Sequence, residues 1–160
     1  MEKKRKLLYW EGSSKKGFKE FPIDVQKDMG VALFVVQLGG TPDSAKLWKG
    51  QENIMNRNEH PQGTDNVLLD LGLDDAEELS AKAALALKLN KLIGQRGLNQ
   101  TAAAAITGMT QPKVSQVRRY KLQNISLERL MQALVSLDQH VEIVVQPARR
   151  AHAPGITVAA

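Results

Sequence analysis

The 160-residue sequence contains no cysteine, so it can form neither disulfide bonds nor thiolate metal sites. A chain without disulfides suits a reducing compartment, and we expect a cytoplasmic protein. The histidines, His60, His140 and His152, lie in unrelated contexts, and none is followed by a second ligand three or four residues later. We therefore expect no metal site.

Long apolar runs and phosphate-binding loops are also missing. The longest apolar run, Val31 to Val36, is far shorter than the ~20 residues that span a bilayer, so we expect no membrane segment. No glycine-rich phosphate loop is present, and no serine, including Ser13 and Ser14, lies in a nucleophile-elbow pattern. We expect a protein that is not an enzyme and needs no cofactor. The 42% hydrophobic content is nevertheless sufficient for a core.

Charge is distributed unevenly along the chain, whose formal net charge is +5. Residues 79–160 contain eleven Lys or Arg and three acidic residues, whereas residues 56–78 contain one Arg and seven acidic residues. A basic region favours phosphate binding through counterion release. The acidic segment before it is either a solvated helix start or a surface for a basic partner.

The stretch from Leu98 to Leu122 predicts two short helices around a glycine turn. Asn99 can cap a first helix over residues 100–107, and Gly108 can supply the left-handed residue at which it stops. Thr110 can cap a second helix that begins at Gln111, where the following proline is tolerated in the first turn. This arrangement is typical of the helix-turn-helix unit, whose second helix enters the major groove of DNA.

The second helix carries side chains that suit base recognition on one side, while Val114 and Val117 point the other way. Amide, ammonium and hydroxyl groups in its first two turns can pair with base edges. The predicted base-reading residues are Gln111, Lys113, Ser115 and Gln116. Residues at the helix ends and in the first helix are better placed for phosphates. The predicted phosphate-contacting residues are Gln100, Thr110, Arg118, Arg119 and Lys121. The alternative is a small helical domain with a solvated polar face.

Two further helices and one strand are predicted around this unit. Asp74 can cap a helix ending at Gly97, with Leu85, Leu89 and Leu92 on its apolar face. Ser126 can cap another helix that runs to about residue 136. Residues 140–146 have the alternating, β-branched pattern of a strand. Its partner is either the same strand of a second copy or a segment of the same chain.

The first fifty residues predict a small strand-helix-helix fragment. The strand covers residues 6–10, a short helix capped by Ser13 or Ser14 extends to Phe18, and a longer helix covers residues 23–38. We expect the longer helix to bury one apolar face, formed by Val25, Met29, Ala32, Leu33 and Val36.

Residues 98–120 resemble the helix-turn-helix of the phage-repressor-like (XRE) family. The matching features are Gln100 opening the first helix, Ala103 and Ala104 facing the partner helix, Gly108 in the turn, and the run from Thr110 to Ser115. Tyr120 stands where that family often has a glycine. The wider stretch, residues 56–147, resembles a HigA-type antitoxin of the same family.

This resemblance implies a dimer that binds double-stranded operator DNA, represses its own toxin–antitoxin operon and neutralises a cognate RelE/HigB-type toxin. An alternative function is a toxin-neutralising interaction module with little DNA specificity of its own. The expected fold is mainly α, with a five-helix-type helix-turn-helix DNA-binding domain and a C-terminal β-strand.

The first fifty residues resemble the N-terminal half of a RelE/HigB-type toxin. The segments that carry this resemblance are LYWEGSSKKGFKEFP, DVQKDMGVALFVVQLGG and AKLWKG. The resemblance implies a truncated fragment, because the catalytic sheet of that toxin family has no counterpart here. The expected organisation is a toxin-like fragment at 1–50, a linker at 51–66, the antitoxin domain at 67–147 and a flexible tail at 148–160. Without its sheet, the fragment should be less stable than the antitoxin domain or should pack upon it.

Overall fold

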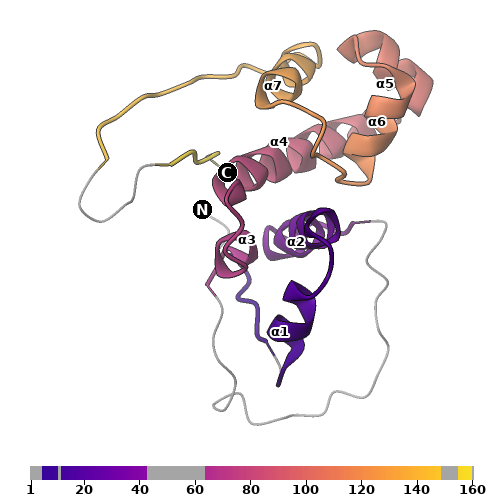
Figure 1. The fold of residues 1–160 in the computed structure, drawn as a ribbon. Coiled ribbons are helices and arrows are strands. Elements are labelled where there is room, and N and C mark those ends of the chain that lie inside the picture. Colours follow the sequence, from indigo (N-terminus) through magenta and orange to yellow (C-terminus); the bar gives the residue numbers. More distant parts are fainter. Residues whose placement is uncertain (1–4, 11, 43–63, 149–154, 160) are drawn as a thin grey trace.

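The structure, a computed structural model, describes residues 5–10, 12–42, 64–148 and 155–159. These residues form seven helices and no strand (Figure 1). The helices are α1 (Ser14–Lys19), α2 (Ile23–Gln37), α3 (Val67–Asp70), α4 (Ala76–Gln95), α5 (Gln100–Thr107), α6 (Gln111–Arg118) and α7 (Leu127–Val135). The predicted mainly helical fold is confirmed, with five of these helices between residues 67 and 135.

The N-terminal segment is extended but is not a strand. A backbone hydrogen bond from Lys6 N to Gln37 O, 3.0 Å long, joins it to α2. Trp10 and Phe18 are buried and pack edge to face, with ring centroids 5.7 Å apart. The prediction of a strand over residues 6–10 is therefore wrong. A strand needs a hydrogen-bonded neighbour, and no neighbouring strand is present among the described residues.

Helix α2 has the predicted extent but buries the opposite face. Val31, Phe34 and Val35 are at most 1% exposed, whereas Val25 and Met29 are about two-fifths exposed. The prediction failed because α2 is apolar on two sides, so periodicity alone does not select the buried one. The partners α3 and α4 select it.

Two features let α2 lie close to these partners. A Cβ added at Gly30 would come within 2.8 Å of Leu68 Cδ2, so the glycine permits the close approach of α3. Gln37 is 3% exposed, and its Oε1 accepts a hydrogen bond from Val67 N (2.9 Å) while its Nε2 donates to Lys6 O (3.1 Å) and Thr64 O (3.2 Å). This amide ties together the N-terminal segment, α2 and the start of α3.

Helix α4 is the central element, with α2 and α3 on one side and α6 and α7 on the other (Figure 1). Its predicted inward residues Leu85 and Leu89 are buried. Its N-cap position, however, is Asp75 rather than the predicted Asp74, and Asp75 makes no capping hydrogen bond. The Asp75 carboxylate instead meets Lys27 of α2, with Oδ2 2.7 Å from Nζ.

Helix α7 closes the core over α4 and α5. The predicted Ser126 cap is confirmed, because its hydroxyl accepts from Arg129 N at 3.2 Å. Leu130 and Leu134 are buried. The buried hydrophobic residues of the N-terminal helices and of α3 to α7 form one continuous cluster. The described part of the N-terminal fragment therefore packs upon the C-terminal helices, which was one of the two outcomes expected for it.

The predicted C-terminal strand is also wrong. Residues 141–148 are extended, but no strand forms in the described part of the chain, and Ile143, Val144 and Val145 are 72%, 61% and 91% exposed. A strand requires a paired neighbour, and this chain supplies none there among the described residues. The predicted linker at 51–66 and tail at 148–160, together with the segment AKLWKG, fall largely outside the described residues. Among the helices described, none is long and apolar enough to span a bilayer.

Candidate nucleic-acid interface

Helices α5 and α6 and the turn between them have the local geometry predicted from the sequence. The Asn99 side chain accepts a hydrogen bond from Ala102 N (2.8 Å) and caps α5. Gly108 ends α5 with a φ of +64°, in the left-handed region that glycine adopts without a steric penalty. Both predictions are confirmed.

The turn is held in place by α7. The Arg129 guanidinium of α7 donates a hydrogen bond to the Gly108 carbonyl, and Met109 is buried beside it. Sequence reasoning did not assign Arg129, because its partner lies 21 residues away and no local motif marks the pair. Arg129 thus links the position of the turn, and with it the start of α6, to the hydrophobic core.

Helix α6 is anchored by Val114 and Val117, which are 2% and 1% exposed. These valines point inward as predicted. Thr110 occupies the N-cap position with extended backbone, but its side chain makes no capping hydrogen bond, so that part of the prediction is wrong. The threonine is exposed at the edge of the turn.

The end of α6 is fixed from two sides. Asn90 of α4 donates from Nδ2 to Val117 O at 3.0 Å. Tyr120 follows the helix with a φ of +57° and a buried side chain. A left-handed residue other than glycine costs roughly 1–2 kcal/mol, and burial of the ring offsets this cost. Tyr120 therefore adopts the left-handed turn at the position where the phage-repressor-like family often has a glycine.

The outward side of α6 presents amide, hydroxyl and guanidinium groups together. Gln111 is exposed, and Ser115 and Gln116 are half-buried. Residues four apart share a face of a helix, which aligns Gln111, Ser115 and Arg119. Arg119 Nε donates to Ser115 O at 3.3 Å. Sequence reasoning placed Arg119 with the phosphate contacts, but helical spacing puts it beside the proposed base-reading residues.

Lys113 lies on the far flank of α6 from Gln111, next to Gln116, which follows it three residues later. Its position is about 200° around the helix from Gln111, and its ammonium donates to Asn124 O at 3.3 Å. It is exposed on the flank that borders the loop after α6. A contact from Lys113 to a base would require this hydrogen bond to break.

The predicted phosphate residues surround the outward face. Arg118 and Lys121 are exposed beside it, Arg119 is exposed on the face itself, and Gln100 is half-buried at the first position of α5. Lys121 also faces the N-terminal region, because its Nζ lies 3.9 Å from Asp28 Oδ2 of α2. Gln123 donates to the other oxygen of the same carboxylate at 3.0 Å. Helix α2 therefore borders the interface at the end of α6 without crossing its outward face.

Three carboxylates of the acidic segment are engaged within the molecule. Asp70 accepts from Thr64 N (2.8 Å), Asp75 pairs with Lys27 (2.7 Å) and Glu78 pairs with Lys82 (2.6 Å). The hydrogen bond that Lys27 donates to Asp75 raises the pKa of Lys27 above its ordinary value. These pairings join part of the acidic segment to the rest of the fold.

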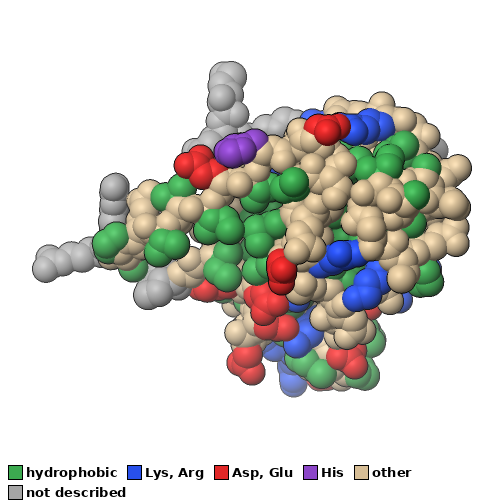
Figure 2. Space-filling view, turned by 90° about the horizontal axis from the view of Figure 1, so that it is seen from above, with side chains coloured by type: hydrophobic (Ala, Val, Ile, Leu, Met, Phe, Trp, Pro, Cys, Tyr) green, Lys and Arg blue, Asp and Glu red, His purple; other side chains and the backbone are tan. Residues whose placement is uncertain are grey.

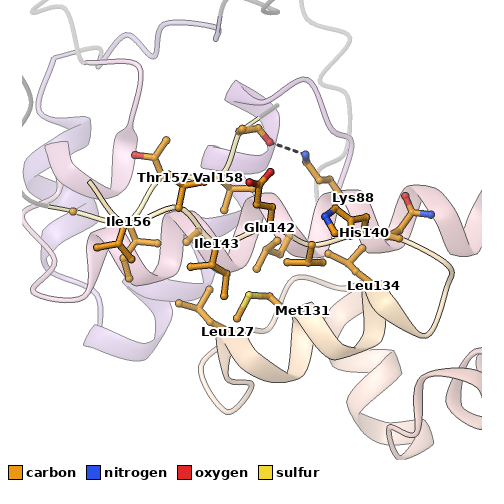
Figure 3. Close-up of a pocket in the computed structure, with 18 of the residues that line it drawn as sticks. Lys88, Leu127, Met131, Leu134, His140, Glu142, Ile143, Ile156, Thr157 and Val158 are labelled. Atoms are coloured by element: carbon orange, nitrogen blue, oxygen red, sulfur yellow. Dashed lines mark hydrogen bonds between the residues drawn. The ribbon is translucent and has the colours of Figure 1, made fainter. Parts of the chain in front are cut away.

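A second notable surface is an apolar groove between α4, α7 and the extended C-terminal segments (Figure 2). Leu127, Met131 and Leu134 of α7 line it, and Ile143 lies over it (Figure 3). The chain crosses back at residues 155–159, where Lys88 donates to Ala159 O at 2.6 Å. Within the ranges that the structure describes, no three metal-ligating side chains cluster.

Comparisons with known proteins agree with this geometry. A family model described as a helix-turn-helix domain matches residues 67–146, which is half of the chain. A solved structure named as that of an XRE-family transcriptional regulator is 50% identical, with a TM-score of 0.50, and the match covers 54% of this chain and 98% of that one. No curated protein matches the chain.

Proposed function

The chain belongs to the helix-turn-helix domain family, and from that premise we propose that it is a transcriptional repressor that binds operator DNA in a sequence-specific manner. The observation that carries the proposal is the outward face of α6. It combines Gln111, Ser115, Gln116 and Arg119 above a helix side that is fixed in the core. The similar solved protein is named as a transcriptional regulator, which supports the same function here.

The chemistry of this face suits the major groove. Glutamine pairs bidentately with adenine, arginine pairs with guanine, and serine pairs with either. The surrounding cations Arg118, Lys113 and Lys121 suit the flanking phosphates. Gln100 and Thr110 lie at the starts of α5 and α6, where unpaired N–H groups of a first helical turn favour phosphate oxygens.

We further propose that the protein acts as a homodimer. The extended segment 141–148 exposes Ile143, Val144 and Val145 beside the apolar groove, and an unpaired edge of this kind pairs readily with an identical segment across a two-fold axis. A dimer matches the two half-sites of an operator. Val145→Lys should abolish the dimer in sedimentation experiments without unfolding the monomer, since Val145 is 91% exposed.

The proposed biological role is that of an antitoxin. Its support is the resemblance of residues 56–147 to HigA-type antitoxins, and the cognate partner would be a RelE/HigB-type toxin. A mobility-shift assay with DNA from upstream of the gene, repeated with that toxin, separates the two candidate functions. A repressor shifts the DNA alone, whereas a toxin-neutralising module binds toxin tightly and DNA weakly.

The proposed base readout is tested with Gln116→Ala. The variant should lose ~1–3 kcal/mol of discrimination between operator and unrelated duplex. Gln95→Ala, which removes an exposed amide at the end of α4, is the matched control and should bind as the wild type does. Because each phosphate contact contributes ~0.9 to the slope of log K against log salt, binding should weaken steeply as salt is raised. Unaltered operator preference in Gln116→Ala would exclude the proposed reading face.

A further inference from the structure

A hydrogen bond crosses the helix-turn-helix from one helix to the other. Gln111 is the first residue of α6, and its Nε2 donates to Thr101 Oγ1 at 2.9 Å. Thr101 is the second residue of α5, and both side chains are exposed. Since Arg129 and the capped end of α5 hold the two helices in a fixed relation, the threonine hydroxyl is a fixed point for the glutamine amide.

This bond leaves the glutamine able to recognise a base. The side-chain amide has two N–H donors and one carbonyl acceptor, and Thr101 takes one donor. The second N–H and Oε1 remain, which are the groups that pair with N7 and N6 of adenine. An unrestrained glutamine loses up to ~1.5–2 kcal/mol of rotamer freedom when it is immobilised. A side chain already held by Thr101 loses less on binding.

We propose that Thr101 is a positioning residue for base recognition: it orients the Gln111 amide so that α6 reads an adenine at one position of each half-site. This inference rests on the proposed DNA-binding function and deepens it. Thr101 itself contacts no base. Its contribution appears as discrimination at the base pair under Gln111 and not as overall affinity.

The test selects bound duplexes from a random-sequence library with the full chain, in the wild type and in T101V, T101S, Q111A and the double variant T101V/Q111A. T101V keeps the shape of threonine and removes the hydroxyl, whereas T101S keeps the hydroxyl. T107V is the matched control, because the Thr107 hydroxyl of the same helix donates to Ala103 O (2.7 Å) and lies in the core. Thermal unfolding verifies that each variant is folded.

The wild type should prefer adenine at the position read by Gln111, and Q111A should lose that preference. T101V should reduce it by about 2- to 10-fold, the equivalent of one neutral hydrogen bond, and should leave the other positions unchanged. T101S should retain the preference, and T101V/Q111A should match Q111A.

Three results would overturn the role of Thr101. The first is a T101V profile identical to that of the wild type. The second is a uniform loss of affinity over all sequences, which indicates a phosphate contact. The third is an effect of T101V that persists in full on the Q111A background. If the wild type selects no sequence at all, the proposed function itself fails, so the two failures are distinguishable.

Discussion

Helices α2 and α6 both pack against α4, but they differ in how their sequences specify a buried face. Helix α6 has valines on one side and polar groups on the other, so the choice is fixed by its composition. Helix α2 carries Val31, Phe34 and Val35 on one side and Val25, Met29 and Val36 on the other. Its orientation is set by the available partners. The N-terminal helices therefore depend on the helix-turn-helix part for their position, while α6 keeps its outward side open.

The largest effect is expected from Phe34→Ala, which tests whether α2 depends on the helices from α4 to α7. Phe34 is 1% exposed, and truncating such a ring costs ~3–5 kcal/mol in the free energy of unfolding. Since the core is continuous, denaturant unfolding of the wild type and of the variant should each show one transition that includes α4 to α7. Val36→Ala, on the outer side of the same helix, should cost far less. Two separate transitions in the wild type, with only one of them shifted by Phe34→Ala, would show that the N-terminal helices fold independently.

A smaller effect is expected from Gln37→Met. The variant leaves the buried Val67 N without its side-chain partner, which costs about 1–3 kcal/mol, whereas Lys6 O lies at a partly exposed position and loses less. Gln26→Met is the control, because Gln26 donates to two backbone carbonyls in an exposed setting. Equal stability losses for the two variants in urea unfolding would show that the Gln37 amide does not hold the N-terminal segment to α2 and α3.

The smallest effect concerns the ion pair that joins α2 to α4. The hydrogen bond with Asp75 raises the pKa of Lys27 above 10.5, so the pair stabilises the fold at neutral pH, and this stabilisation is lost as the pH rises through the raised value. Lys27→Met should cost at most about 1 kcal/mol at neutral pH, since the pair is partly exposed. The difference from the wild type should shrink above pH 10.5. A difference that stays constant with pH would contradict this account.

Local signals predicted the helix-turn-helix well. Asn99, Gly108 and Ser126 each act through hydrogen bonds or backbone angles within a few residues, and all three lie where the sequence placed them. Long-range contacts escaped prediction. The buried face of α2 depends on α3 and α4, and Arg129 reaches the turn from a distant helix. The failed strand over residues 140–146 has the correct residue pattern, but it has no partner in the described part of the chain.

In the candidate site, too, local features were predicted from the sequence and long-range contacts were not. The sequence indicated that polar groups gather on α6, and the structure places Gln111, Ser115 and Gln116 outward. It could not reveal that Thr101 bonds to Gln111 or that Lys113 turns toward Asn124, because both contacts join residues ten or more positions apart. Whether the assigned residues contact bases or phosphates remains a prediction.

The most direct test of the account is nuclear magnetic resonance of the full chain titrated with a selected duplex, following the side-chain amides of Gln111 and Gln116 and the backbone of α2. Large shifts of both amides, with α2 nearly unchanged except beside Asp28, are predicted. Unmoved amides, with shifts concentrated on α2 or on the groove near Ile143, would contradict the claim that the outward face of α6 reads DNA.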